Sequence, residues 1–418
     1  MTKLDLTFNP YKKEAILAVN GEVRPKVRTR ICGANGAELS SWVDDFFRRA
    51  VDEFNDKLEV TFNGTQCDYD FMENVLKRYE DRDIIQLRQN RILPADPNLE
   101  IVVTGGMACG KATLIDSMIG RKLLSEGAMK AKPASSIVRI HKVTGMPDFK
   151  VMVYDVSGNV LKECETMTLD GICGLNDVSS SSVVEIYGDI PFIESNGITM
   201  TATFGSSNYM TSEHLIQTYS SFDGVLEPMI IYVLNAMAIG IVENDKLIRK
   251  VATIMKQGDG QNHDRLLFVL NKSDVFDPDT EPIARTLDYV RAYLGSCGIS
   301  NPRVMPASAR LAKLIRQSRN ASSTIKAIEK RVLCTDVDWF VNENRIHFSD
   351  YATFLSPSTD IALKQRIQEG MEQSEKYKGV ACKYEMALSE LALLYSGVPS
   401  IEMAISEYYN LQLKEKKQ

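Results

Sequence analysis

The chain has 418 residues, 44% of them apolar, four histidines and a formal net charge of −6, which predicts two or three globular domains and no imidazole metal cluster. It carries no basic stripe, which argues against nucleic acid as a partner, and its longest apolar run, Met229 to Val242, is too short to span a bilayer. No signal peptide is visible at Met1 to Asp5, and the eight cysteines form no Cys-x-x-Cys pair, so we expect reduced thiols and a cytoplasmic location.

Residues 1–92 are predicted to form a small α+β module with an interaction role. Alternating apolar and polar residues predict its strands, and Asn-Gly pairs predict its turns. Apolar residues spaced three or four positions apart predict its helices. In chain order we expect strands at Leu4–Phe8 and Ala15–Val19, a hairpin turn at Asn20-Gly21, a helix over Leu39–Phe54, a strand at Lys57–Phe62, a turn at Asn63-Gly64 and a helix over Phe71–Tyr79. The proline-containing residues 93–98 are predicted to be a linker.

A glycine loop then stands between a predicted strand and a predicted helix. The apolar run Leu99 to Val103 precedes it and an amphipathic stretch from Leu114 to Ile119 follows, which is the context that a phosphate-binding P-loop requires. In such a loop, backbone N–H groups and a helix N-terminus face the phosphates, and a lysine reaches the outer ones. The candidate residues are Gly105, Gly106, Met107, Ala108, Cys109, Gly110, Lys111, Ala112 and Thr113.

Two positions of this loop bear on metal binding and on thiol chemistry. The pattern GxxxxGK[ST] asks for a hydroxyl that ligates Mg²⁺, and Ala112 has none, although Thr113 is adjacent and is an alternative ligand. Phosphate binding tolerates this change better than metal binding does. Cys109 lies beside the helix N-terminus, where we expect the thiolate to be favoured.

A polar tetrapeptide, Asn271-Lys272-Ser273-Asp274, directly follows the apolar run Leu266 to Leu270. A carboxylate after a strand can accept two hydrogen bonds, from the ring N–H and the exocyclic amine of guanine, with a geometry that adenine does not match. Asn271, Lys272 and Asp274 therefore predict a guanine site.

A third motif follows at the end of another predicted strand. The run Arg303 to Pro306 leads into Ser308 and Ala309, where nucleotide-binding α/β GTPases place a backbone N–H against the guanine oxygen. The order of the three motifs, each at the carboxyl end of a predicted strand, favours a guanine-nucleotide site. Other predicted elements are strands at Phe149–Tyr154, Val183–Tyr187 and Met229–Val242, and helices at Ala362–Met371, Lys383–Leu394 and Ser400–Lys416, with Gly397 as a cap.

The segment Thr104 to Gly120 resembles the P-loop and first helix of bacterial dynamin-like proteins, which carry a similar Gly-Lys-Ser-Thr-Leu-Ile-Asn run. Lys132–Val138 looks like their switch I segment, Gly197–Gly205 like the strand that ends in Asp-x-x-Gly, and Ser396–Tyr409 like the closing helix of the GTPase head. The resemblance covers about Leu99 to Tyr409.

The chain departs from that family at residues that serve magnesium. Ala202 stands where the family has the aspartate that holds the metal through a water, and Ala112 removes the direct ligand. Switch I would supply Ser135, or alternatively Ser136, as a weak ligand. Because phosphoryl transfer depends on positioning and on charge neutralisation by the metal, the resemblance implies slow or absent hydrolysis.

Other departures and alternatives concern the two switches. Gly205 matches the glycine of switch II, whereas Met107 replaces a polar residue that assists catalysis in the family. The true aspartate could instead be Asp189 or Asp223, and Thr113 could serve the metal. These alternatives stay open on the sequence alone.

The resemblance implies an α/β P-loop GTPase head of dynamin type, doubly wound around a mostly parallel central sheet, at residues 99–330, with closing helices at 331–418. It implies GTP or GDP as ligand with weakly held Mg²⁺, and a homodimer or a heteromer with another dynamin-like chain. Peripheral membrane contact is compatible with this but not encoded here. The alternative functions are an active GTPase in membrane remodelling and a scaffold that binds no nucleotide.

Overall fold

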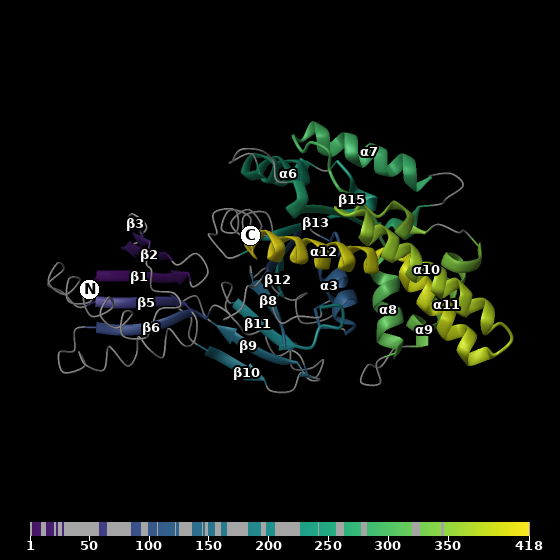
Figure 1. Ribbon diagram of the computed structural model, residues 1–418, viewed down its shortest axis with the longest axis horizontal. Coiled ribbons are helices and arrows are strands. Elements are labelled where there is room, and N and C mark those ends of the chain that lie inside the picture. The colour runs from purple at the N-terminus through teal and green to yellow at the C-terminus, as the bar shows by residue number, and fades with distance from the viewer. Residues whose placement is uncertain are drawn as a thin grey trace. The chain divides into compact units, whose positions relative to one another are not determined.

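The computed structural model of the chain divides into two compact units (Figure 1). The first contains Met1–Asn98 and Asp223–Leu226, and the second contains Leu99–Phe222 and Glu227–Gln418. The structure describes residues 2–9, 14–20, 22–23, 27–28, 58–64, 85–92, 99–106, 108–121, 123–124, 136–143, 145–146, 149–154, 160–164, 183–193, 198–204, 226–240, 242–255, 263–276, 282–319, 327–343 and 347–417. The helices predicted at Leu39–Phe54 and Phe71–Tyr79 and the linker 93–98 lie outside these residues.

The first unit is built on a six-stranded sheet with the order β3-β2-β1-β5-β6, in which β4 also pairs with β2. The strands predicted near Leu4, Ala15 and Lys57 are confirmed, because β1 pairs antiparallel with β2 and parallel with β5. The strands are β1 (Thr2–Asn9), β2 (Glu14–Val19), β3 (Glu22–Val23), β4 (Val27–Arg28), β5 (Leu58–Gly64) and β6 (Ile85–Ile92).

The turn predicted at Asn63-Gly64 is wrong. Both residues belong to β5, where they pair with Arg91 and Ile92 of β6. Because β5 and β6 run parallel, the chain between them must cross over from one end of the sheet to the other, and a tight turn cannot make that connection.

The second unit is built on a nine-stranded sheet with the order β10-β9-β11-β8-β12-β7-β13-β14-β15. Five pairs of neighbouring strands are parallel, namely β11·β8, β12·β7, β7·β13, β13·β14 and β14·β15. Three pairs are antiparallel, namely β8·β12, β9·β11 and β9·β10. The predicted α/β class with a mostly parallel central sheet is confirmed. The strands are β7 (Leu99–Gly105), β8 (Ser136–Lys142), β9 (Lys150–Tyr154), β10 (Val160–Cys164), β11 (Val183–Gly188), β12 (Ile198–Phe204), β13 (Met229–Asn235), β14 (Leu266–Asn271) and β15 (Val304–Ala307).

Continuous apolar runs form the central strands, as expected of parallel strands that are covered on both faces. Every residue of β7 and β14 is buried. The run from Met229 continues as a strand only to Asn235, whose side chain accepts a hydrogen bond from Met237 N–H and so begins the short 3-10 helix η3 (Ala236–Ala238). The core therefore lies along β7, β13 and β14.

Among the described residues, helices follow β7, β13, β14 and β15 in the chain. In Figure 1, α3, α8 and α12 lie next to one another, while α6 and α7 lie together and share a hydrogen bond from Tyr293 to Asp245. Among the described residues, no helix is both long enough and apolar enough to cross a membrane. The helices are α3 (Lys111–Ile119), α6 (Val242–Met255), α7 (Ile283–Ser296), α8 (Ala309–Arg319), α9 (Ala327–Asp338), α10 (Pro357–Lys376), α11 (Ala381–Tyr395) and α12 (Val398–Lys417).

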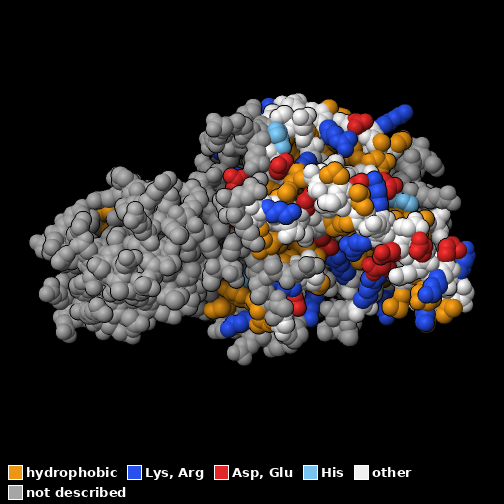
Figure 2. All heavy atoms as spheres, viewed as in Figure 1, with side chains coloured by type: hydrophobic (Ala, Val, Ile, Leu, Met, Phe, Trp, Pro, Cys, Tyr) orange, Lys and Arg blue, Asp and Glu red, His pale blue; other side chains and the backbone are white. Residues whose placement is uncertain are grey.

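The three helices predicted near the C-terminus are confirmed as α10, α11 and α12. The residues between α8 and α10 show no clear sequence pattern, and the structure has α9, the π-helical segment Trp339–Glu343 and the 3-10 segment Phe348–Tyr351 there. On the face shown in Figure 2, acidic and basic side chains are interspersed rather than gathered by sign. This agrees with the absence of a basic stripe in the sequence.

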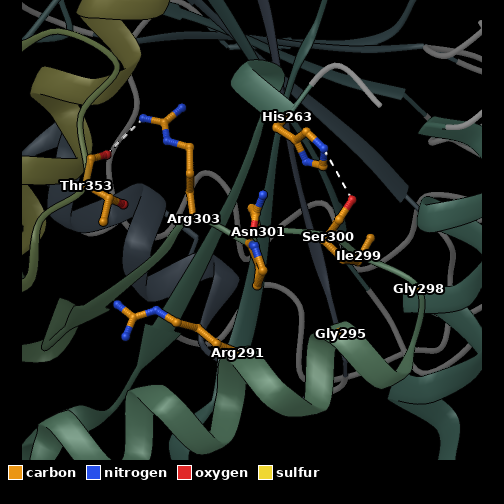
Figure 3. A pocket seen from close by; sticks show the side chains of 10 residues that line it. His263, Arg291, Gly295, Gly298, Ile299, Ser300, Asn301, Arg303 and Thr353 are labelled. Atoms are coloured by element: carbon orange, nitrogen blue, oxygen red, sulfur yellow. Dashed lines mark hydrogen bonds between the residues drawn. The ribbon is translucent and has the colours of Figure 1, made fainter. Parts of the chain in front are cut away.

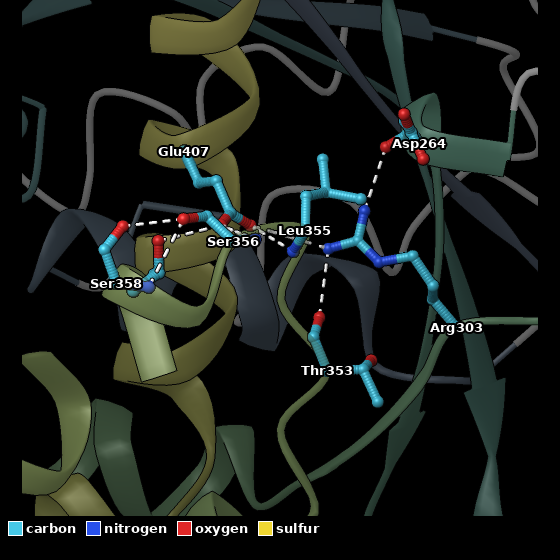
Figure 4. A network of polar contacts seen from close by, with 8 residues as sticks. Asp264, Arg303, Thr353, Leu355, Ser356, Ser358 and Glu407 are labelled. Atoms are coloured by element: carbon cyan, nitrogen blue, oxygen red, sulfur yellow. Dashed lines mark hydrogen bonds and ion pairs between the residues drawn. The ribbon is translucent and has the colours of Figure 1, made fainter. Parts of the chain in front are cut away.

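A buried carboxylate on α12 anchors the start of α10 (Figure 4). Glu407 accepts hydrogen bonds from the N–H groups of Leu355 and Ser356 at 2.8 and 2.7 Å and from the Thr359 hydroxyl at 2.7 Å. The Arg303 guanidinium lies 4.0 Å from the same carboxylate. One side chain thus joins α12 to the turn before α10 and to the strand β15, which Arg303 precedes.

A second buried pair joins α12 to the helix that follows the glycine loop. Arg316 on α8 donates two hydrogen bonds to Glu402 on α12 and a third, at 2.7 Å, to the carbonyl of Ser117 near the end of α3. Burial raises the pKa of the Glu402 carboxyl, and the nearby Arg316 opposes that rise. Arg316 thus favours the charged form of Glu402, and its hydrogen bonds connect α3, α8 and α12.

Gly397 fits a close approach between the α11–α12 junction and β15. It adopts φ +80°, which confirms the predicted cap, and a Cβ there would lie 2.2 Å from the carbonyl oxygen of Pro306. Gly379, in the α10–α11 turn, has a similar φ of +90° with no atom within 4 Å of such a Cβ. Substitution of Gly379 therefore tests backbone strain alone, whereas substitution of Gly397 tests the same strain together with a steric clash.

We predict that Gly379→Ala lowers the free energy of unfolding by about 1–2 kcal/mol, from left-handed strain alone. Gly397→Ala adds a clash with backbone to the same strain and is expected to lower it by about 3–5 kcal/mol. Urea denaturation of both variants measures the difference. Equal losses would contradict the close approach at Pro306.

Candidate functional site

The strand order changes direction at β7. From β7 the chain builds β8 to β12 on one side, and then β13, β14 and β15 on the other. Because β7, β13, β14 and β15 are parallel, their carboxyl ends share one edge of the sheet. Ligands of open α/β sheets bind at that edge, next to such a switch point. The three motifs singled out in the sequence all follow strands that end there.

The glycine loop has the backbone of an anion cradle. Ala108 and Gly110 adopt left-handed conformations, with φ of 55° and 96°, between β7 and α3. Alternation of left- and right-handed residues turns successive N–H groups to one side of a loop. No side chain caps α3, and its first turn carries no acidic residue. The N-cap residue, Gly110, has no side chain that could accept from the first N–H groups of α3, and such a helix start suits an anion.

Lys111 holds the inside of this loop. Its ammonium group donates to the carbonyls of Gly105 and Gly106 at 3.0 and 2.9 Å, and Nζ lies 3.8 Å from Cys109 Sγ. The side chain is only 6% exposed. An ammonium has three donors, and the contact with sulfur is the weakest of the three here. A phosphate oxygen can replace that contact without breaking the other two.

The expectation of a favoured thiolate at Cys109 is wrong. Burial raises the pKa of the Cys109 thiol, and the Lys111 charge opposes this only in part. The thiol is 2% exposed, so the cost of removing a thiolate from water outweighs the attraction of the lysine.

Asn271 joins the two other motifs to the glycine loop. Its Nδ2 donates to the carbonyl of Cys109 at 2.9 Å, and its Oδ1 accepts from the N–H of Ala309 at 3.2 Å. The amide is buried. A Cβ on Gly110 would lie 2.2 Å from Nδ2, so the glycine is required for this approach as well as for its positive φ.

Lys272, in the same tetrapeptide, makes a second hydrogen bond to the glycine loop. It adopts φ 65°, and its Nζ donates to the carbonyl of Ala108 at 2.8 Å. The hydroxyl of Ser273 donates to the carbonyl of Leu270 at 2.7 Å and fixes the turn itself. Asn271 and Lys272 thus act on the loop, and the turn leaves Asp274 for another role.

The Ser308-Ala309 turn is held from two sides. The N–H of Ser308 donates to the carbonyl of Ser396 at 2.9 Å, which places the turn against the α11–α12 junction. The sequence motif predicts that a backbone N–H of this turn contacts the guanine oxygen, and the N–H of Ala309 donates to Asn271 in this structure. Both residues are fully buried.

Asp274 lies in the 3-10 helix η5 (Ser273–Val275) with 14% of its side chain exposed. Its neighbour is Arg310, which is 3.5 Å away and also hydrogen-bonds to Asp336 at 2.9 Å. Neither the Asp274–Arg310 contact nor the Arg310–Asp336 contact was predicted from the sequence. Arg310 directly follows Ala309, which was a usable signal, whereas Asp336 comes from a region without a readable pattern.

The residues at the expected magnesium positions do not fit a tightly held metal ion. Ala112 and Thr113 lie partly exposed in the first turn of α3, and Ala202 is buried in β12, in register with Val103 of β7. The methyl groups of Ala112 and Ala202 supply no oxygen that could ligate a metal ion. Ser135, Met107, Gly205 and Asp223 lie outside the described residues.

The alternative that Asp189 is the magnesium-binding aspartate is wrong. β11 is parallel to β8, and β8 is antiparallel to β12 and hence to β7. Asp189 follows β11, so it lies at the opposite edge of the sheet from the glycine loop. There it pairs with Lys142, whose hydrogen bond lowers the pKa of Asp189.

A wide, open hollow of about 970 Å³ lies at that opposite edge (Figure 3). Arg303 donates there to the carbonyl of Thr353 at 3.0 Å, Arg291 pairs with Asp288 at 3.0 Å and His263 contacts Ser300 at 3.4 Å, whereas the Thr353 hydroxyl and Arg303 Nε are buried without a hydrogen-bond partner. No residue of the glycine loop, the tetrapeptide or the Ser308-Ala309 turn lines this hollow. The glycine loop is therefore the better candidate site.

No protein-family model matches the chain, and the comparison with curated proteins finds no relative. Among solved structures, two matches belong to an oligomerised bacterial dynamin pair, described as a mechanism for long-range sensing and tethering of membranes. One is 13% identical over 85% of this chain and 50% of that chain, with a TM-score of 0.39. The other is 13% identical over 76% and 45%, with a TM-score of 0.32. The chain thus spans about half of their length.

The role of the Asn271 amide leads to a prediction with a matched control. Asn271→Asp places a carboxylate oxygen against the carbonyl of Cys109, whereas Asn342→Asp makes the same change at an exposed amide that donates to Asp338 at 2.6 Å. We expect Asn271→Asp to lower the free energy of unfolding by about 2–4 kcal/mol, and Asn342→Asp by less than about 1 kcal/mol. Thermal or urea unfolding measures both, and similar losses would argue against the Asn271 bridge.

Proposed function

We propose that the chain binds guanine nucleotides at the carboxyl edge of the second unit's sheet. The observation that carries this proposal is a pair of hydrogen bonds, from the side chains of Asn271 and Lys272 to the carbonyls of Cys109 and Ala108. They tie a base-recognition element to a phosphate-binding loop. An isolated glycine turn has no need of such ties.

Each part of the nucleotide has a chemical partner in this proposal. The N–H groups of the loop from Gly106 to Gly110 and of the first turn of α3 receive the phosphates, together with Lys111. Asp274 accepts the ring N–H and the exocyclic amine of guanine, which adenine lacks in that arrangement. The Ser308-Ala309 turn closes the base end of the site.

Hydrolysis is proposed to be slow or absent. The γ-phosphoryl group transfers through a charged transition state that protein and metal must neutralise. Ala112 and Ala202 put methyl groups where two metal anchors are required, so bound nucleotide is held mainly by the loop and Lys111. The chain then acts as a guanine-nucleotide-binding head rather than as an efficient GTPase.

The proposed head comprises residues 99–330, with residues 331–418 as its closing helices. The resemblance of these residues to dynamin-like proteins further suggests a homodimer, or a heteromer with a dynamin-like chain that supplies the missing chemistry. Peripheral membrane contact would then come through such an assembly. The solved structures of the bacterial dynamin pair are described as oligomers that tether membranes.

Nucleotide titration tests the binding proposal. Fluorescent GTP and GDP are expected to bind the full chain, ATP and ADP more weakly, and removal of Mg²⁺ to change the affinity little. Lys111→Met removes the ammonium that faces the phosphates and is expected to weaken binding of all four nucleotides by about ten-fold or more. A chain without preference for guanine over adenine nucleotides would refute the proposal, whereas phosphate release at an ordinary GTPase rate would refute only the impaired hydrolysis.

Restoration of the two metal anchors gives a separate prediction. Ala112→Ser supplies a hydroxyl in the first turn of α3, and Ala202→Asp supplies a carboxylate at the end of β12, so the double variant is expected to bind GTP more tightly with Mg²⁺ than without it. Titration at fixed ionic strength with Mg²⁺ or with EDTA measures this. Ser117→Thr, within α3 but away from the loop, is the control and should leave the affinity independent of Mg²⁺. No gain of magnesium dependence would mean that a motif is misplaced.

A further inference from the structure

Asp274 shares its cationic neighbour with a second carboxylate. Arg310 Nη2 lies 2.9 Å from Asp336 Oδ2 and 3.5 Å from Asp274 Oδ2. The contact with Asp336 is a hydrogen bond, whereas the contact with Asp274 is an ion pair only. The three residues come from η5, from the first turn of α8 and from the last turn of α9.

The position of this guanidinium decides what Asp274 can accept. Guanine needs both carboxylate oxygens of Asp274 as acceptors. A guanidinium that donated directly to those oxygens would form a charge-assisted hydrogen bond, which is stronger than a bond from a neutral base. Arg310 would then compete with guanine for Asp274. In the structure, Arg310 Nη2 donates its hydrogen bond to Asp336 Oδ2 and not to Asp274.

The triad is partly shielded from water, so its contacts are not those of a freely solvated pair. The side chains of Asp274 and Asp336 are 14% and 20% exposed, and that of Arg310 is 54% exposed. Burial raises the pKa of Asp336, Arg310 opposes this, and the charge of Asp274 adds to it. Arg310 thus favours the charged form of Asp336, and the hydrogen bond between them keeps the two side chains together.

We infer that Asp336 is a positioning residue for base recognition: it holds Arg310 away from Asp274 and so keeps both oxygens of Asp274 available to guanine. This inference rests on the proposed guanine-nucleotide binding. It gives α9, which carries no recognised nucleotide motif, a part in the selectivity of the site.

The test is the selectivity of Asp336→Asn in the full chain. The neutral amide is a weaker partner for the guanidinium, so Arg310 moves onto Asp274 and GDP affinity is expected to fall about ten-fold. ADP affinity is expected to be unchanged, because adenine does not use Asp274. Asp338→Asn, on the same helix with its side chain exposed, is the matched control and should leave both affinities unchanged.

A double-mutant cycle distinguishes positioning from a structural role. In the Arg310→Met background no guanidinium competes for Asp274, so Asp336→Asn is expected to have no further effect on GDP affinity. Asp336→Glu keeps the charge and is expected to bind GDP within about two-fold of the unaltered chain. A merely structural Asp336 would instead lose affinity for GDP and ADP alike in both backgrounds.

The outcomes separate this inference from the proposal beneath it. If the unaltered chain prefers guanine nucleotides but Asp336→Asn binds GDP equally well, or if its loss persists in the Arg310→Met background, the inference is overturned and the proposed function stands. If Asp336→Asn does not fold, Asp336→Ser replaces it with the same expectations. A chain without guanine preference overturns both.

Discussion

The two hydrogen bonds of the Asn271 amide are the interaction on which the candidate site depends. One bond reaches the glycine loop through the carbonyl of Cys109, and the other holds the turn at Ala309. Three loops that lie far apart in the sequence are therefore fixed by one buried side chain. Because both ends of a buried amide must be satisfied, a shift of any one loop would leave a polar atom unpaired in the core. The site is consequently rigid where the chain itself is irregular.

The same edge of the sheet is supported from the C-terminal helices. The carbonyl of Ser396 receives the N–H of Ser308, and Gly397 brings the α11–α12 junction against Pro306. On the far side of α8, Arg316 ties the end of α3 to Glu402 of α12. Short, buried polar contacts thus connect the glycine-loop helix α3 and the Ser308 turn to α12. Under the proposed function, a bound nucleotide would act on α12 through these contacts.

Much of the central sheet could be predicted from the sequence because its strands are continuous apolar runs that end in distinctive motifs. The strands β7 and β14, the helix α3 and the cap at Gly397 all carry such local signals. The strand β8 was missed because Arg139 and His141 interrupt its apolar pattern, and the turn at Asn63-Gly64 was wrong because the direction of the next strand is a tertiary property. The bonds of Asn271 and the Arg310–Asp336 pair were likewise out of reach, since they join residues distant in the chain.

The arrangement of charge in the glycine loop bears on what the missing metal anchors mean. In a site with strong metal ligands, the cation supplies most of the charge that neutralises the outer phosphates. Under the proposed function Ala112 and Ala202 offer no oxygen ligand, and two described cations contact the loop: Lys111, which is buried among loop carbonyls, and Lys272, which donates to the carbonyl of Ala108. A buried ammonium already held by two carbonyls loses little freedom when an anion arrives, so it favours binding. A coordinated cation stabilises the negative charge that develops on the leaving oxygen during transfer. An ammonium fixed to two carbonyls does not. The proposed combination of phosphate binding with slow or absent hydrolysis follows from this difference between a fixed ammonium and a coordinated cation.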